Sequence, residues 1–367
     1  MSTILFATWD GGGNVPPVLA IATELAGRGH DVRFLGHRGQ EERFAGTGVG
    51  FAAYPTAADF SATAGPTLGR LLANFADRAK GRDVVAELGA RPADLVVVDC
   101  YLFGVMHELR AAGLPYVVVE HSLLGSFRRD LAGPLALMLR LRGVNPRALV
   151  EAGRAVLVTS LADLDTDAAP GAVHTGPVVV GTPARPTEPT VLVSLSTVRF
   201  KGLTDTWQRV LDAVDGLPAR VIATTGPAVD PTELRVPGNV EVHRWVPHDE
   251  VMPQASVVVG HGGHGTTMAA LAHDLPLLVL PVEPKTDQPY IGRRIEQVGA
   301  GRTLSRRSAP ARIRAAIEEL LADGPHRSVA ARLGEQIRSS GGRRRAADLL
   351  EGLLANGVGA RAREPRA

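Results

Sequence analysis

The chain of 367 residues contains one cysteine, Cys100, and few aromatic side chains, which make up 4% of the sequence. A single cysteine excludes an intramolecular disulfide and any cysteine-rich metal site. Cys100 follows an apolar run typical of a buried strand, so we interpret it as a core residue and not as a nucleophile. The sequence therefore predicts no metal site.

The sequence also lacks a strong net charge and a long hydrophobic run. Its 40 basic and 38 acidic residues leave a formal net charge of +2, which provides no electrostatic footprint for nucleic acid. No apolar run approaches the roughly 20 residues that span a bilayer. The start at Met1–Ala7 has neither the basic segment nor the long apolar core of a signal peptide. We expect a cytoplasmic monomer or homodimer, without a nucleic-acid partner or stable membrane insertion.

What the sequence does contain is an alternation of short β-rich apolar runs with helical patterns, which is typical of parallel sheets covered by helices. The runs in the first half are Ile4–Thr8, Val32–Leu35, Leu95–Val98, Tyr116–Val119 and Ala155–Val158. The pattern starts again in the second half, with Val191–Leu195, Val221–Ala223, Val240–Val242, Val257–Val259 and Leu277–Leu280. Two successive sets predict an α/β protein with two doubly wound, Rossmann-like domains.

The join between the two sets lies in residues 181–190, which contain three prolines and no helical or strand period. We interpret this segment as an interdomain linker. The predicted domains are therefore residues 1–180 and 191–345. A C-terminal helix is predicted at 346–357, and a disordered tail at 358–367.

The segment VVVGHGGHGTT at 257–267 combines a buried strand, a glycine-rich loop and the start of a helix. Gly263 and Gly265 allow the backbone to approach a ligand closely, and the N–H groups of the helix point into the same space. That geometry suits a diphosphate, with His261 and Thr266 as additional donors. A tight strand–helix turn with a capping threonine is the alternative interpretation.

Three further loops follow predicted strands of the second half. Ser196-Thr197 supplies hydroxyls, Trp245-Val246 offers a flat aromatic face, and Asp287-Gln288 pairs a carboxylate with a carboxamide. An aromatic face suits a nucleobase, and the acid–amide pair suits sugar hydroxyls. Open α/β sheets bind ligands at the carboxyl ends of their strands, where all of these loops lie.

Taken in order, Trp245-Val246-Pro247, His261-Gly262-Gly263, Gly265-Thr266-Thr267 and Asp287-Gln288 resemble the donor signature of family 1 glycosyltransferases. The likeness is closest to bacterial members that decorate natural products. It extends over nearly the whole chain, including Ser194-Leu195-Ser196-Thr197 and the N-terminal strand, glycine loop and helix. The resemblance implies the GT-B fold, in which two domains face a central cleft and a C-terminal helix packs back on the N-terminal domain.

The resemblance also implies roles for individual residues. Trp245 would stack on the base, and the backbone of Val246 would pair with its edge. His261 and Thr266 would bind the diphosphate, with Ser196, Thr197, Gly263 and Gly265 beside them. Asp287 and Gln288 would hold the sugar. Such enzymes invert the anomeric centre without a bound metal, and the uridine or thymidine diphosphate sugar is a substrate, so no cofactor is expected.

Two positions depart from the family pattern. Ala269 stands where members commonly have a glutamate that holds the ribose hydroxyls, which favours a thymidine nucleotide because its ribose lacks the 2′-hydroxyl. Asn14 stands where the family usually has its general-base histidine, and an amide cannot take a proton at neutral pH. Asn14 before Val15-Pro16-Pro17 also suits a helix N-cap.

Without that histidine, the base must come from another strand end. Asp99 matches the family aspartate that orients the histidine, and we expect it to accept a hydrogen bond from Asn14. Asp10 is the first candidate for the base, although it also suits a cap for the glycine turn that follows it. His121 is the second, because its unperturbed pKa suits base work at neutral pH.

The sequence therefore predicts an inverting, metal-independent glycosyltransferase that acts on a small hydrophobic acceptor, for example in antibiotic biosynthesis. The acceptor would contact the segments at 10–14, 59–72, 120–127 and 135–141. Two alternatives stay open: a sugar-nucleotide epimerase or hydrolase of the same fold, and a non-catalytic partner that binds the nucleotide sugar.

Overall fold

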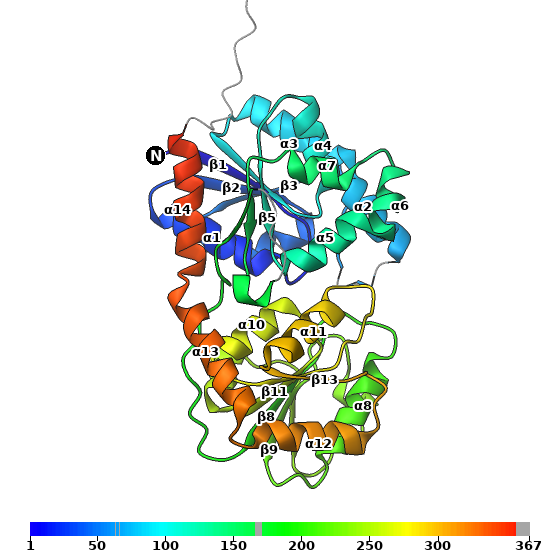
Figure 1. The fold of residues 1–367 in the computed structure, drawn as a ribbon. Coiled ribbons are helices and arrows are strands. Elements are labelled where there is room, and N and C mark those ends of the chain that lie inside the picture. The colour runs from blue at the N-terminus through cyan, green and yellow to red at the C-terminus, as the bar shows by residue number, and fades with distance from the viewer. Residues whose placement is uncertain (63, 66, 166–170, 357–367) are drawn as a thin grey trace, which may run out of the picture. The chain divides into compact units, whose positions relative to one another are not determined.

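The computed structural model describes residues 1–62, 64–65, 67–165 and 171–356, and these form two compact units. The first unit contains the described residues of 1–162, 166–178 and 341–356. The second unit contains residues 163–165 and 179–340. Each unit has its own parallel sheet (Figure 1). The tail predicted at 358–367 lies outside the described residues.

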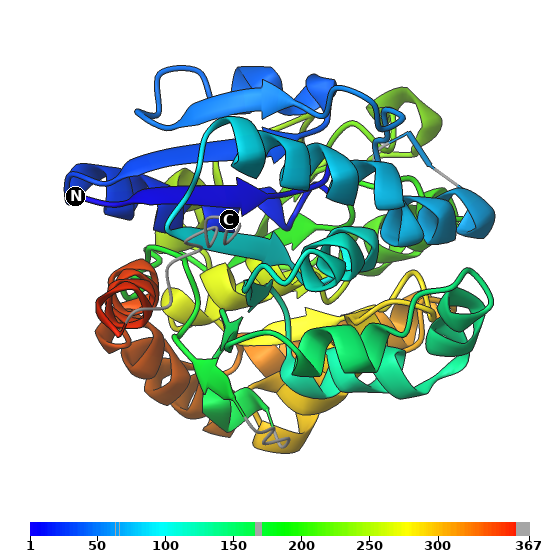
Figure 2. The same cartoon turned by 90° about the horizontal axis from the view of Figure 1, so that it is seen from above.

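The sheet of the first unit has seven strands in the order β3-β2-β1-β4-β5-β6-β7. All neighbours pair in parallel, and the blue arrows near the N-terminus point the same way in Figure 2. The chain direction across the sheet reverses between β1 and β4, which makes this point the switch point of a doubly wound fold. The strands are β1 (Thr3–Ala7), β2 (Asp31–Gly36), β3 (Gly50–Ala53), β4 (Leu95–Asp99), β5 (Val117–Glu120), β6 (Val156–Val158) and β7 (Ala172–His174).

Helices cover both faces of this sheet because successive side chains of a strand point to opposite faces. In β1, Ile4 and Phe6 enter one core together with α1, and Leu5 and Ala7 enter the other together with α3 and α4. Among the described residues of the first unit, five helices of eight residues or more precede the C-terminal helix. They are α1 (Val15–Gly27), α2 (Leu68–Ala76), α3 (Arg78–Ala90), α4 (Phe103–Ala111) and α5 (Leu124–Ala132). Shorter ones are α6 (Pro134–Arg140), α7 (Pro146–Glu151) and η1 (Arg38–Arg43), and η2 (Ala162–Leu164) spans the boundary between the two units.

The C-terminal helix α14 (Gly342–Ala355) belongs to the first unit and lies beside α1 (Figure 1). Ala346 and Leu350 are fully buried in the core that α1 shares with the sheet. On the polar side of the contact, the Arg28 guanidinium donates to the Glu351 carboxylate at 2.7 Å. The helix is thus held by apolar burial together with ion pairs.

The sheet of the second unit has six parallel strands in the order β10-β9-β8-β11-β12-β13. This is again a doubly wound arrangement, with its switch point between β8 and β11. The strands are β8 (Thr190–Ser194), β9 (Arg220–Thr224), β10 (Val240–His243), β11 (Val257–Gly260), β12 (Leu277–Val279) and β13 (Gly301–Thr303).

One face of the second sheet is covered by α8 (Leu203–Val214) and α12 (Pro310–Leu321), where Trp207 is fully buried among valines of β8 and β11. Elsewhere in the unit α10 (His264–Ala272) packs against α13 (Pro325–Ser339). The remaining elements are α9 (His248–Val251), α11 (Gln288–Val298), η3 (Pro231–Glu233) and η4 (Met252–Gln254).

Residues 179–189 contain no helix or strand, and they lie on the second unit. Within this segment Ala184 N–H donates to the His273 carbonyl at 3.0 Å, and Arg185 N–H donates to the Pro253 carbonyl at 2.9 Å. The segment predicted as a linker is therefore hydrogen-bonded to one unit. Apart from residues 163–165, which belong to the second unit, the chain passes between units after Val178 and again after Ser340.

The two parallel, doubly wound sheets confirm the predicted fold class. The apolar runs identified every central strand, whereas β3, β7 and β13 were not predicted. Those three are sheet edges of three or four residues. Across the described ranges, no helix has the length and apolar character needed to cross a bilayer.

Candidate functional site

The glycine-rich loop of the second unit begins at the carboxyl end of β11, beside the switch point. Gly262 has φ +87°, which disfavours any residue with a Cβ, and a Cβ there would lie 2.9 Å from the Gln288 carbonyl oxygen. A Cβ on Gly263 would lie 2.6 Å from Nε2 of His261. These glycines are therefore required by close packing of the loop, and Gly263 lets the His261 ring lie against the start of α10.

His261 is partly buried, and loss of solvation lowers its pKa to about 4. The ring is therefore neutral at pH 7 and can donate one hydrogen bond. Its Nδ1 is buried and has no hydrogen-bond partner among the residues described. Thr266 is half-buried in the first turn of α10, and Gly265 is exposed beside it. The N-terminus of a helix, with a neutral imidazole beside it that can donate a hydrogen bond, is suited to an anionic ligand.

Ser196 and Thr197 follow β8, which is the other strand of the switch point. The Ser196 hydroxyl is buried and accepts the Val198 N–H at 3.0 Å, so it stabilises its own turn. Thr197 is exposed. Sequence reasoning missed a neighbouring pair here: Ser194 Oγ lies 3.0 Å from Nε2 of His248, which ties the β8 end to α9.

Trp245 and Val246 follow the edge strand β10. The Trp245 side chain is 72% exposed, so one face of its ring is open to a flat ligand. Val246 is half-buried. The loop is the only one of the predicted donor loops that begins at an outer strand of the sheet.

Asp287 and Gln288 lie at the start of α11, in the loop after β12. Gln288 is buried, and its Oε1 accepts the N–H groups of Val282 and Glu283 at 2.8 and 3.0 Å. Only its amide N–H groups are left for a ligand. Asp287 is half-buried at the N-cap position of the helix, without a side-chain capping bond.

In the first unit, Asp99 ends β4 and meets the loop that follows β1, again at a switch point. Asn14 Nδ2 donates to Asp99 Oδ2 at 2.8 Å, as expected from the sequence, and also to the Trp9 carbonyl at 3.0 Å. Asn14 occupies the N-cap position of α1, but its side chain makes no capping bond. The prediction of a side-chain cap was therefore wrong, because the amide is used to hold Asp99.

Trp9 was not identified from the sequence. Its Nε1 donates to Asp99 Oδ1 at 2.8 Å, and the Tyr101 N–H donates to the same oxygen at 3.1 Å. Burial alone would raise the pKa of Asp99, but the charge of His121 and the hydrogen bonds from Asn14 and Tyr101 hold it below its ordinary value. Asp99 is therefore a buried carboxylate that is ionised at neutral pH.

His121 follows β5, and its Nε2 lies 3.6 Å from Asp99 Oδ2. The imidazole and the carboxylate thus form a pair between adjacent strands. The same Nε2 lies 3.5 Å from the Cys100 sulfur, whose thiol pKa is raised well above its ordinary value by burial. Glu120 is 1% exposed, and burial raises its pKa to about 7.

Asp10, the first candidate for the base, is also buried in the first unit. Its Oδ1 lies 3.5 Å from the Arg43 guanidinium without hydrogen-bond geometry. The structure thus places Asp10 against a cation and His121 against an anion.

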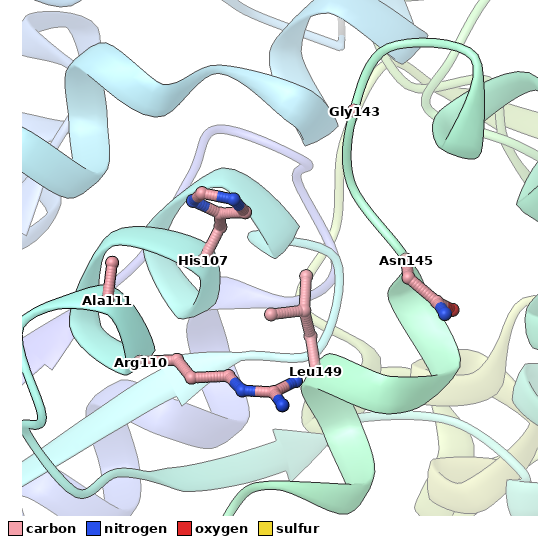
Figure 3. A pocket seen from close by; sticks show the side chains of 6 residues that line it. All are labelled: His107, Arg110, Ala111, Gly143, Asn145 and Leu149. Atoms are coloured by element: carbon pink, nitrogen blue, oxygen red, sulfur yellow. The ribbon is translucent and has the colours of Figure 1, made fainter.

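The predicted acceptor segments differ in exposure. Phe60 is buried against Trp9, with 5.9 Å between ring centroids, and Leu124 is buried as well. Leu137 and Leu141 are 60% and 81% exposed. A cavity of about 390 Å³ lies between α4 and α7, lined by His107, Arg110, Ala111, Gly143, Asn145 and Leu149 (Figure 3). None of the predicted site residues lines this cavity.

The chain is similar to several known proteins. Residues 208–351 match the family described as "Erythromycin biosynthesis protein CIII-like, C-terminal domain". The 4'-demethylrebeccamycin synthase of Lentzea aerocolonigenes is 28% identical, over 96% of this chain and 99% of the relative. The oleandomycin glycosyltransferase of Streptomyces antibioticus is 34% identical, over 46% of this chain and 39% of the relative. Among solved structures, a calicheamicin glycosyltransferase matches with a TM-score of 0.78 and 25% identity, over 99% of this chain and 100% of that one.

Proposed function

We propose that this chain, which belongs to the bacterial family 1 glycosyltransferases of natural-product biosynthesis, transfers a sugar from thymidine diphosphate to a small hydrophobic acceptor. The transfer is a single displacement that inverts the anomeric centre and requires no metal. The donor is held by the second unit, and the base that activates the acceptor belongs to the first.

The observation that carries the proposal is the order of the candidate residues along the edge of the second sheet. Trp245 follows β10, Ser196 and His261 follow the central strands β8 and β11, and Gln288 follows β12. Along the sheet edge, an aromatic face is therefore followed by hydrogen-bond donors for an anion and then by an amide. From β10 to β12 this order covers four strand spacings, or about 19 Å. A nucleotide sugar has its base, diphosphate and sugar in the same order.

The thymidine form of the donor is favoured by Ala269. This residue lies in α10, on the helix that follows the glycine loop. A methyl group can make no hydrogen bond to a ribose hydroxyl, so the position gives no advantage to a ribose over a 2′-deoxyribose. Comparing the affinities of thymidine and uridine diphosphate by calorimetry tests the preference.

We assign the base to His121, with Asp99 as the residue that positions it. If Nε2 carries its proton toward Asp99, then Nδ1 carries the lone pair that accepts the proton of the acceptor nucleophile. The nucleophile attacks the anomeric carbon while the bond to the diphosphate oxygen breaks, and the diphosphate leaves with that electron pair. The buried carboxylate stabilises the imidazolium that forms, as in other histidine–carboxylate pairs.

The test compares His121→Gln with Asp10→Asn in buffer that contains a chelator. His121→Gln should lower turnover by about 10²–10⁴-fold, because general-base catalysis contributes that much, and should leave the affinity for thymidine diphosphate unchanged. Asp10→Asn should lower turnover by less than about tenfold. Near-normal turnover of His121→Gln, together with a large loss of turnover in Asp10→Asn, would show that Asp10 and not His121 is the general base.

A further inference from the structure

Three side chains with different metal-ligating atoms meet where β4 and β5 end. A carboxylate oxygen of Asp99, the sulfur of Cys100 and a ring nitrogen of His121 lie within 4.8 Å of one another. His121 Nε2 is 3.5 Å from the Cys100 sulfur and 3.6 Å from Asp99 Oδ2, and the sulfur is 3.9 Å from Asp99 Oδ1. Asp99 ends β4, and Cys100 and His121 directly follow the neighbouring parallel strands β4 and β5, so the sheet holds the three together.

The separations of His121 Nε2 from the Cys100 sulfur and from Asp99 Oδ2, 3.5 and 3.6 Å, match those of a tetrahedral zinc site. Zinc binds nitrogen and oxygen at about 2.0–2.1 Å and thiolate sulfur at about 2.3 Å, which puts ligand atoms about 3.3–3.6 Å apart at tetrahedral angles. A thiolate and an imidazole together select zinc over magnesium or calcium, which prefer oxygen ligands. The cluster thus needs little rearrangement to bind this metal.

The Asp99 carboxylate has capacity for a metal in addition to its hydrogen bonds. A carboxylate offers about four lone-pair positions. The N–H groups of Trp9, Tyr101 and Asn14 occupy three of them, two on Oδ1 and one on Oδ2, and the Cys100 thiol, whose proton is lost when it binds a metal, also points to Oδ1. The remaining position is on Oδ2, the oxygen beside His121. The three donors would then fix the orientation of a ligand from its outer side, as in known metal sites.

Glu120 supplies a second, independent observation. Its carboxylate is 1% exposed, and Oε1 accepts the Ser122 N–H at 2.8 Å. Oε2 is buried and has no hydrogen-bond partner in the described structure, and the carboxylate interacts with the neighbouring Cys100 thiol. An unpartnered buried carboxylate oxygen is costly, and a cation bound by the neighbouring Cys100 would stabilise its charge.

We propose that Asp99, Cys100 and His121 bind one zinc ion that inhibits the enzyme, with the charge of the neighbouring Glu120 carboxylate stabilising the bound cation. Binding converts the Cys100 thiol to a thiolate and releases its proton to solvent, and the lone pair of His121 Nε2 becomes a bond to zinc. The inhibitory part rests on the proposed function, because the metal takes the imidazole away from its role as base. The metal is thus a competitor of the proton transfer and has no part in it.

The binding test uses cobalt(II) in place of zinc, on the full chain and without any sugar substrate. Since Cys100 is the only cysteine, a thiolate-to-cobalt charge-transfer band in the near ultraviolet can come only from this site. One equivalent of cobalt should produce the band, and zinc should remove it. Cys100→Ala should abolish the band and weaken zinc binding by at least about 100-fold. Glu120→Gln should keep the band but weaken binding.

His107→Ala, which removes a histidine from the cavity in Figure 3, is the control and should bind zinc like the unmodified protein. In turnover assays, zinc should inhibit the unmodified protein reversibly, whereas Cys100→Ala should keep its turnover in chelator and resist zinc. Absence of the cobalt band, with equal zinc affinity in Cys100→Ala, would overturn the site. A band without inhibition would overturn only the inhibitory role, and neither result bears on whether the protein transfers sugar.

Discussion

The imidazole of His37 lies in the first unit with 2% of its surface exposed, edge-on to Tyr54 at 5.6 Å between ring centroids. Burial and the charge of Lys80 lower its pKa to about 4, and the carboxylates of Asp59 and Asp10 oppose this shift. The folded protein therefore binds fewer protons at His37 than the unfolded chain does between pH 4 and pH 6.5. As the pH falls through this window, folding stability is lost.

His37→Phe should remove this part of the acid sensitivity. A shift from 6.5 to about 4 corresponds to about 3 kcal/mol, which is fully present above pH 6.5 and lost at pH 4. Phe lacks the titration and fits among Tyr54 and Phe60, the aromatic neighbours of the ring. Urea unfolding at pH 4.5, 5.5 and 7 should show a smaller decline for the variant. His243→Phe, at an exposed position, should decline like the unmodified protein, and an equal decline of His37→Phe would contradict the account.

His261→Ala should weaken the binding of thymidine diphosphate by about 1–3 kcal/mol, as expected when one hydrogen bond to a charged group is lost. The ring is neutral at pH 7, so the loss reflects a hydrogen bond and not a full charge. Titration calorimetry at pH 7.5 measures it. His326→Ala, at the start of α13, is the control in the same unit. Unchanged affinity of His261→Ala would remove this residue from the diphosphate site.

Side-chain partners were the part of the site that the sequence revealed least. The resemblance to family 1 glycosyltransferases matched Asn14 and Asp99 to a pair of residues in contact, so the hydrogen bond between them was predicted. The indole of Trp9 on the same carboxylate was not, because alternation along a strand does not give the direction of a residue beyond the strand end. The pairing of His121 with Asp99 likewise depends on which strands are neighbours.

Among the elements, α14 shows how a terminal helix is joined to a core distant in sequence. Leu350→Ala should cost about 2–5 kcal/mol of unfolding free energy, because Leu350 is fully buried against α1 and its loss leaves a cavity. Leu353→Ala, at a half-buried position on the same helix, should cost less. Chemical unfolding monitored by circular dichroism measures both. Equal and small losses would mean that α14 contributes little to the first unit.

Strand order is an element-level property that local sequence does not contain. The apolar runs predicted the strands that flank both switch points, because these strands are buried on both faces and consist mostly of apolar residues. They could not show that Trp245 follows an outer strand, β10. This strand lies three places along the sheet from β11, which precedes the glycine loop, although Trp245 and the loop are close in sequence. Edge strands such as β13 were missed because three residues that include Gly301 and Arg302 carry no apolar pattern.

The two units divide the proposed chemistry between them. The donor residues from Ser196 to Gln288 all belong to the second unit, and Asp99 and His121 belong to the first. The sequence predicted this division, since each half carries its own set of strands and its own chemistry-bearing loops. The sequence also left three possibilities open: a glycosyltransferase, an epimerase or hydrolase, and a non-catalytic partner. A glycosyltransferase consumes the donor only with an acceptor, an epimerase or hydrolase consumes it alone, and a non-catalytic partner does not consume it.

The most direct test of sugar transfer measures the release of thymidine diphosphate from a thymidine diphosphate sugar, with and without a panel of small hydrophobic acceptors. We predict release only with an acceptor, in equal amount to a glycoside of inverted anomeric configuration detected by mass spectrometry and proton NMR. Consumption of the donor at the same rate without any acceptor would identify a hydrolase or epimerase. Donor binding without consumption under every condition would identify a non-catalytic partner, and either result would contradict the proposed transfer.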